Sequence, residues 1–153
     1  MKNFMEAAAL ILLLAMFAVV GISWSGLPDF IPTHYNAAGA PDHYGSKESV
    51  WLLPAIGTSL YLLMTVIARL AASGSIRLNV PPGVDVQAPA VQAEGQNSLA
   101  MLKVAVMATF AYITWSQTSR PQQGLGPGFL PVMLIVPLAL IGVFVLRMRR
   151  YRA

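Results

Sequence analysis

The sequence contains no cysteine and few charged residues. The lack of cysteine excludes disulfides, thiol redox chemistry, and zinc or iron–sulfur centres held by cysteine. Charged residues make up only 10% of the chain, whereas a soluble domain has about 25%. So few charges could hardly cover a water-facing surface. Hydrophobic residues reach 56% and arrive in long blocks, which indicates that lipid is the solvent.

The apolar blocks predict an all-α membrane protein with four transmembrane helices in a single domain, residues 1–153. About 20 helical residues span the roughly 30 Å of a bilayer's hydrocarbon core. We expect the first block to be retained in the protein, because it is long for the apolar part of a signal peptide. The predicted helices cover residues 5–24, 50–70, 99–115 and 129–146.

The distribution of Lys and Arg predicts that both ends of the chain lie in the cytoplasm. With the N-terminus inside, the outer side holds only Lys47 and Arg120, and Trp24, Trp51 and Trp115 all lie at the outer interface. The positive charge is thus a signal of topology, and we expect no nucleic-acid partner. The other basic residues fall on the inner side, and they are Lys2, Arg69, Arg77, Lys103, Arg147, Arg149, Arg150 and Arg152.

The segments inside the membrane and on its inner side carry little predicted chemistry. Residues 71–98 are rich in Ala, Pro, Gln and Gly, so we expect a flexible cytoplasmic loop. Lys103 lies one turn inside the third block, from where its side chain can reach the interface. No acidic residue lies near the predicted bilayer centre, and Glu6 lies near the inner end. This weakens the hypothesis of a transporter.

The first outer loop, residues 25–49, is the richest in polar, aromatic and turn-forming residues. Asn36 and Asp42 can bond their own backbone in Asx-turns, while Gly39 and Gly45 can supply positive φ. One interpretation is therefore a well-ordered cap over the helices. Because loops on a rigid scaffold often carry function, the other interpretation is a binding surface.

The same loop resembles a bacterial membrane family. The run Ile31-Pro32-Thr33-His34-Tyr35-Asn36, then Gly39, Pro41-Asp42 and Tyr44-Gly45-Ser46-Lys47, with Leu53-Pro54 opening the next helix, is similar to a domain of unknown function. That domain is found in the N-terminal part of SdpI-type immunity proteins. The resemblance covers about residues 26–70. It implies a protein of several helices in the bacterial inner membrane, with a role in toxin immunity or membrane signalling.

We expect the outer loop to bind a partner, with His34, Asn36, Asp42 and Lys47 as an outward-facing cluster. A metal site made by Asp29, His34, Asp42 and His43 is an alternative, although the two histidines are far apart on an irregular loop. Ser46 with His34 lacks the acid partner of a hydrolase, so we expect no enzyme activity and no cofactor. The predicted partner-binding residues are His34, Asn36, Gly39, Pro41, Asp42, Tyr44, Gly45, Ser46 and Lys47.

The sequence thus predicts a small, non-enzymatic integral membrane protein of immunity, signalling or accessory type. It contacts lipids and a protein partner, the latter through its outer loop. Two alternatives stay open. The chain can be a structural subunit of a larger membrane complex, or a small transporter.

Overall fold

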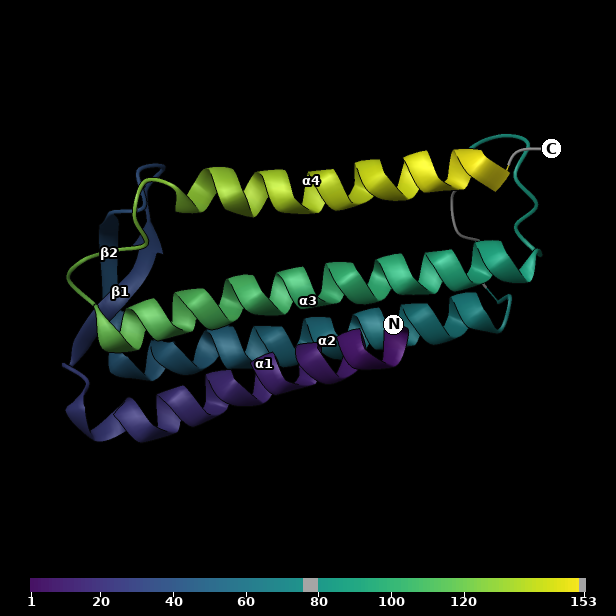
Figure 1. Cartoon of the computed structure of the whole chain (residues 1–153). Helices are drawn as coiled ribbons and strands as arrows, with labels where there is room; N and C mark the ends of the chain where they lie inside the picture. The colour runs from purple at the N-terminus through teal and green to yellow at the C-terminus, as the bar shows by residue number, and fades with distance from the viewer. Residues whose placement is uncertain (76–79, 152–153) are drawn as a thin grey trace.

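The computed structural model describes residues 1–75 and 80–151, and it consists of four long helices and one β-hairpin (Figure 1). All four helices are long and apolar enough to cross a membrane, which confirms the predicted fold class. They are α1 (Lys2–Ser23), α2 (Leu52–Ala72), α3 (Pro89–Ser119) and α4 (Phe129–Met148). Short 3-10 helices flank them at Trp24–Gly26, Lys47–Trp51 and Arg149–Tyr151.

Helix α3 is the centre of the bundle, because it packs against each of the other three helices. The main apolar core joins Ala9, Leu13 and Met16 of α1 to Met107 of α3. Helix α4 lies along α3 on the side away from α1 (Figure 1). The structure describes every residue of α4, and Met148 is the only one that is buried. Nearly all of the apolar surface of α4 therefore faces lipid or another protein.

The loop between α2 and α3 is shorter than predicted, because α3 begins at Pro89 and not near residue 99. Proline at the first position of a helix has the required φ and no N–H to lose. The residues that follow, such as Ala90, Ala93 and Glu94, are good helix formers but too polar for an apolar block to reveal them. Of the predicted flexible loop, residues 76–79 lie outside the described part of the chain. At about 1.5 Å per residue, α3 is about 46 Å long and extends beyond the hydrocarbon core.

The outer loop forms a β-hairpin, which the sequence analysis did not predict. Strand β1 (Phe30–Tyr35) pairs antiparallel with β2 (Pro41–Ser46), with Phe30 opposite Ser46 and Tyr35 opposite Pro41. The hairpin closes one end of the bundle, while the N-terminus and the last turn of α4 lie toward the opposite end (Figure 1). A second small core of Val20, Leu27, Ile31 and Val50 joins the hairpin to α1.

Candidate functional site: the outer hairpin and a buried ion pair

The turn of the hairpin is built by Asn36. Its side-chain Oδ1 accepts hydrogen bonds from the backbone N–H groups of Ala38 and Ala40, at 2.9 and 3.1 Å. Gly39 completes the turn with a φ of 75°, in the left-handed region where glycine has no steric cost. The predicted Asx-turn at Asn36 and the predicted positive φ at Gly39 are therefore confirmed. The positive φ predicted at Gly45 is wrong, because Gly45 lies in the extended strand β2 and has no positive φ. Asp42 pairs with His34 across the hairpin instead of forming an Asx-turn.

His34 and Asp42 form an exposed pair on the hairpin. The imidazole Nδ1 of His34 lies 2.6 Å from Oδ1 of Asp42. Their side chains are 69% and 42% exposed, so the pair faces outward. Among the described residues no group of three His, Asp or Glu side chains gathers in a way that would hold a metal. The alternative metal site at Asp29, His34, Asp42 and His43 therefore has no support in the geometry.

The remaining predicted residues do not all join this pair. Lys47 points to Trp24, with its Nζ 4.9 Å from the ring centroid. Asn36 serves the turn. Ser46 occupies the position before the 3-10 helix Lys47–Trp51 without a side-chain capping bond, and Tyr44 lies exposed on β2. Of the predicted cluster, the structure thus brings only His34 and Asp42 together.

Two predicted residues have tight packing roles. A Cβ added at Gly45 would meet the Thr33 methyl at 2.8 Å, and Pro41 packs beside Gly124.

Tyr35 is half-buried, and burial together with the nearby Tyr44 raises the pKa of its phenol to about 12. The Tyr35 side chain therefore stays neutral at physiological pH.

The tip of the hairpin is fastened to the loop between α3 and α4. The Leu125 N–H donates to the Gly39 carbonyl at 2.7 Å, and a Cβ on Gly39 would overlap the backbone carbonyl of Gly126. Below this contact, the Gln117 Nε2 of α3 donates to the Pro32 carbonyl of β1 at 2.8 Å. Ser116 donates to the Gly124 carbonyl at 2.9 Å. The hairpin is therefore held at its turn by the α3–α4 loop and along β1 by α3.

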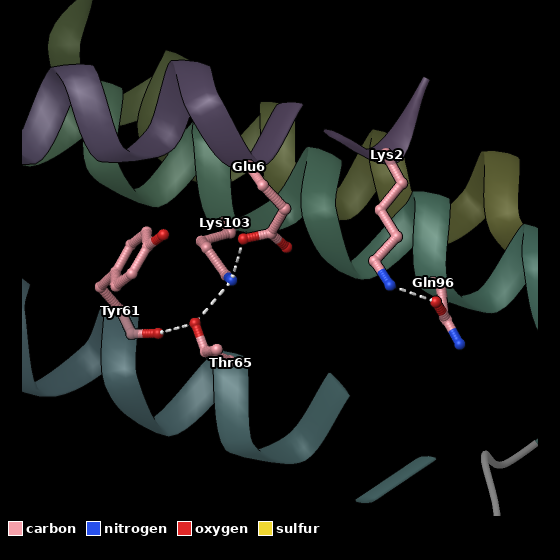
Figure 2. Close-up of polar contacts among 6 residues, drawn as sticks. All are labelled: Lys2, Glu6, Tyr61, Thr65, Gln96 and Lys103. Atoms are coloured by element: carbon pink, nitrogen blue, oxygen red, sulfur yellow. Dashed lines mark hydrogen bonds and ion pairs between the residues drawn. The ribbon is translucent and has the colours of Figure 1, made fainter. Parts of the chain in front are cut away.

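A second polar site lies inside the bundle, around Lys103 of α3 (Figure 2). The Lys103 ammonium donates to Oε2 of Glu6 on α1 at 2.7 Å and to the Thr65 hydroxyl on α2 at 2.9 Å. It also lies 4.7 Å from the centroid of the Tyr61 ring. Lys103 is only 1% exposed. Three helices thus supply one charge-neutral cluster.

The prediction that Lys103 reaches the membrane interface is therefore wrong. The Lys103 Nζ donates to a carboxylate and a hydroxyl within the bundle. Its side chain therefore does not extend to water. Along α3, Lys103 lies about 18 Å below Trp115, which places it in the inner half of a hydrocarbon core roughly 30 Å thick. The signal in the sequence was the pair of opposite charges in two predicted spans, Glu6 and Lys103. Ionisable residues at this depth are rare and often functional.

Further polar contacts tie the first turns of α3 to the other helices. Lys2 of α1 donates to Gln96 (Figure 2), and Arg147 of α4 pairs with Glu94 at 2.9 Å. Both acceptors lie in the part of α3 that the sequence analysis assigned to a flexible loop. This polar segment is helical and connects α1 and α4 at the inner end.

The fold and these sites define a multi-pass membrane protein with a structured hairpin over one end of its bundle. Residues 11–58 match the family described as a domain of unknown function (DUF1648). An uncharacterized protein of Archaeoglobus fulgidus is 37% identical over 49 residues, which cover 32% of this chain and 27% of that protein. The chain therefore spans about a quarter of the relative's length. No solved structure matches the chain.

The family match contains the hairpin and the outer parts of α1 and α2. It supports the resemblance of this segment to a domain of unknown function. The connection to SdpI-type immunity proteins stays a prediction. Glu6, Thr65 and Lys103 lie outside the matched residues.

Proposed function

We propose that this chain is a small, non-enzymatic membrane protein of immunity, signalling or accessory type, and that its outer hairpin binds a protein partner. The observation that carries the proposal is the exposed His34–Asp42 pair on a hairpin fixed to the bundle. A partner can hydrogen-bond to both side chains without waiting for a loop to order. Such preorganisation favours binding, because less conformational entropy is lost.

The geometry of β2 supports the same proposal. In the two-stranded sheet β2 has one neighbour, β1, and its residues Asp42 and Tyr44 are exposed. An exposed strand offers backbone groups to an extended segment of a partner. Tyr44, together with Phe30 on β1, adds aromatic surface of the kind enriched at protein interfaces.

The runner-up is a structural subunit of a larger membrane complex. The observation that favours it is α4, which packs on α3 and leaves most of its apolar residues exposed. A partner helix could cover that surface. A small transporter is a third candidate, favoured by the buried Lys103–Glu6 pair, since proton relays use such residues. In all three cases we propose that the protein resides in a bacterial cytoplasmic membrane.

Extraction in mild detergent, followed by native gels and mass spectrometry, tests the first two proposals. A chain that migrates by itself supports a hairpin receptor. So does a chain that migrates with a partner, if substitutions in the hairpin abolish that comigration. Comigration with a large assembly at fixed stoichiometry, unaffected by hairpin substitutions, supports the subunit and contradicts the receptor.

His34→Ala is expected to reduce recovery of the partner about tenfold, because a hydrogen bond to a charged group contributes about 1.5–3 kcal/mol. The measurement is quantitative mass spectrometry of the protein that copurifies with the tagged chain. His43→Ala is the matched control. It removes the same ring from the facing position of the hairpin and leaves the His34–Asp42 pair intact. Equal recovery with wild type and His34→Ala would contradict a role for the pair.

A further inference from the structure

The two ends of the helical bundle differ in their charged side chains. At the hairpin end, the Lys47 ammonium lies 4.9 Å from the ring centroid of Trp24. The Arg120 guanidinium lies 4.7 Å from that of Trp115. Exposed carboxylates share this end, and they belong to Asp29, Asp42 and Glu48. The described side chains of the hairpin end therefore carry no excess of positive charge.

The opposite end of the bundle, where the last turn of α4 lies (Figure 1), carries an excess of basic side chains. Arg147 pairs with Glu94. Arg149 and Arg150 are exposed, and neither forms an ion pair within residues 1–75 and 80–151. In those ranges, the basic residues of this end are Lys2, Arg69, Arg147, Arg149 and Arg150, against the acidic residues Asp85 and Glu94. Two guanidinium groups are thus available to an anion.

The length of α4 places these two arginines at the level of lipid head groups. The helix begins at Phe129, whose ring stacks on that of Tyr112, so aromatic residues mark the interface at the hairpin end. Its 20 residues are about 30 Å long, which equals the thickness of the hydrocarbon core. Arg149 and Arg150 follow directly, together with Tyr151, a further exposed aromatic residue.

The chemistry of the guanidinium group selects the ligand. Its planar array of N–H donors matches the oxygens of a phosphate, and it is always charged. At this depth, the phosphates within reach of an arginine side chain are those of the bilayer itself. Arginines beside a transmembrane helix attract lipids with a net negative charge, because a zwitterionic lipid also brings its own cation to the site. A soluble phosphate compound has the same group but no acyl chain to hold it there.

We propose that Arg149 and Arg150 bind the phosphate of an anionic phospholipid, in the leaflet at the end of the bundle opposite the hairpin. The lipid holds the end of α4 at the membrane interface. Such an anchor matters for this helix, because α4 packs mainly on α3 and buries only Met148. The proposal does not depend on the protein partner of the hairpin.

Native mass spectrometry of the full chain in mild detergent tests the site. The protein is titrated with phosphatidylglycerol or phosphatidylcholine of identical acyl chains, and the bound lipid is counted. Each arginine near a membrane surface should raise the affinity for the anionic lipid about fivefold. The wild type should therefore prefer phosphatidylglycerol by more than about tenfold. Arg149→Gln/Arg150→Gln should remove this preference, whereas Arg149→Lys/Arg150→Lys should keep most of it, because the charges remain.

Lys47→Gln/Arg120→Gln is the matched control, because it removes the same amount of positive charge from the hairpin end. This variant should keep the preference for phosphatidylglycerol. If both glutamine variants lose it equally, the net charge of the protein attracts the lipid, and the proposal is overturned. An unchanged preference in Arg149→Gln/Arg150→Gln, or no preference in the wild type, overturns it as well.

Glycerol phosphate, added as a soluble competitor, distinguishes a lipid site from a general phosphate site. At the concentration of the lipid it should displace almost none of the bound phosphatidylglycerol, because it lacks the acyl chains. Displacement at that concentration would mean that the two arginines take a free phosphate compound, and the assignment to a lipid would be wrong.

Discussion

Replacing Glu6 by methionine is expected to destabilise the folded protein by about 3 kcal/mol. The substitution removes the carboxylate that lies 2.7 Å from the Lys103 ammonium and leaves that charge unpaired. Breaking a buried ion pair from one side costs about 3–5 kcal/mol, and lipid around the bundle offers the ammonium no alternative partner. Equilibrium unfolding of the purified protein in mixed micelles, followed by circular dichroism, measures the change.

The two single substitutions should differ, because the two partners differ in exposure. The Lys103 side chain is 1% exposed and that of Glu6 is 26% exposed. After Lys103→Met, the Glu6 carboxylate can turn toward the inner interface, so the loss should be smaller than in Glu6→Met. The double variant should recover most of the stability, since an apolar pair of similar volume often replaces a buried ion pair at little cost.

The Arg147–Glu94 pair supplies the control. Its arginine side chain is 43% exposed, and exposed ion pairs contribute at most about 1 kcal/mol. Glu94→Met leaves this exposed arginine within reach of water, so it should change stability much less than Glu6→Met, which leaves a lysine that is 1% exposed. If the losses in Glu6→Met and Lys103→Met simply add in the double variant, the two residues do not act as a pair, and the electrostatic account of this site is wrong.

The four spans were predictable because crossing a bilayer demands long apolar blocks, a condition that each segment meets on its own. The first turns of α3 could not be predicted in this way. Residues such as Gln92, Glu94 and Gln96 look like a loop when apolarity is the only criterion. They are helical because they continue a helix already fixed by packing, and because Gln96 and Glu94 bond to α1 and α4. Those bonds depend on the tertiary structure.

The outer loop shows the same division. The turn was predicted, because the Asn36 side chain can hydrogen-bond to the nearby backbone and Gly39 can adopt a positive φ. The strands beside it were not, because Pro32, Pro41 and Gly45 are unfavourable in strands. Their pairing is stabilised by the contact of β1 with the bundle, where Ile31 is fully buried. Likewise, no local pattern shows that Lys47 turns to Trp24 while His34 turns to Asp42.

Replacing Gly39 by alanine is expected to detach the hairpin from the α3–α4 loop and to destabilise the protein by about 3 kcal/mol. The φ of 75° costs a residue with a Cβ about 1–2 kcal/mol. The added Cβ would also overlap the backbone carbonyl of Gly126, so the two loops must separate. That movement breaks the hydrogen bond from the Leu125 N–H to the Gly39 carbonyl. Hydrogen exchange should then increase at Leu125 and within β1, and thermal unfolding should shift downward.

Gly128→Ala is the control in the facing loop, because a Cβ there meets nothing within 4 Å and its φ is −82°. It should leave both exchange and unfolding close to wild type. Gly124→Ala should resemble Gly39→Ala, since its Cβ would overlap the Gly39 carbonyl. Because both substitutions open the same contact, their double variant should lose less stability than the sum of the two. Full additivity, or unchanged exchange at Leu125 in Gly39→Ala, would mean that this contact does not hold the hairpin on the bundle.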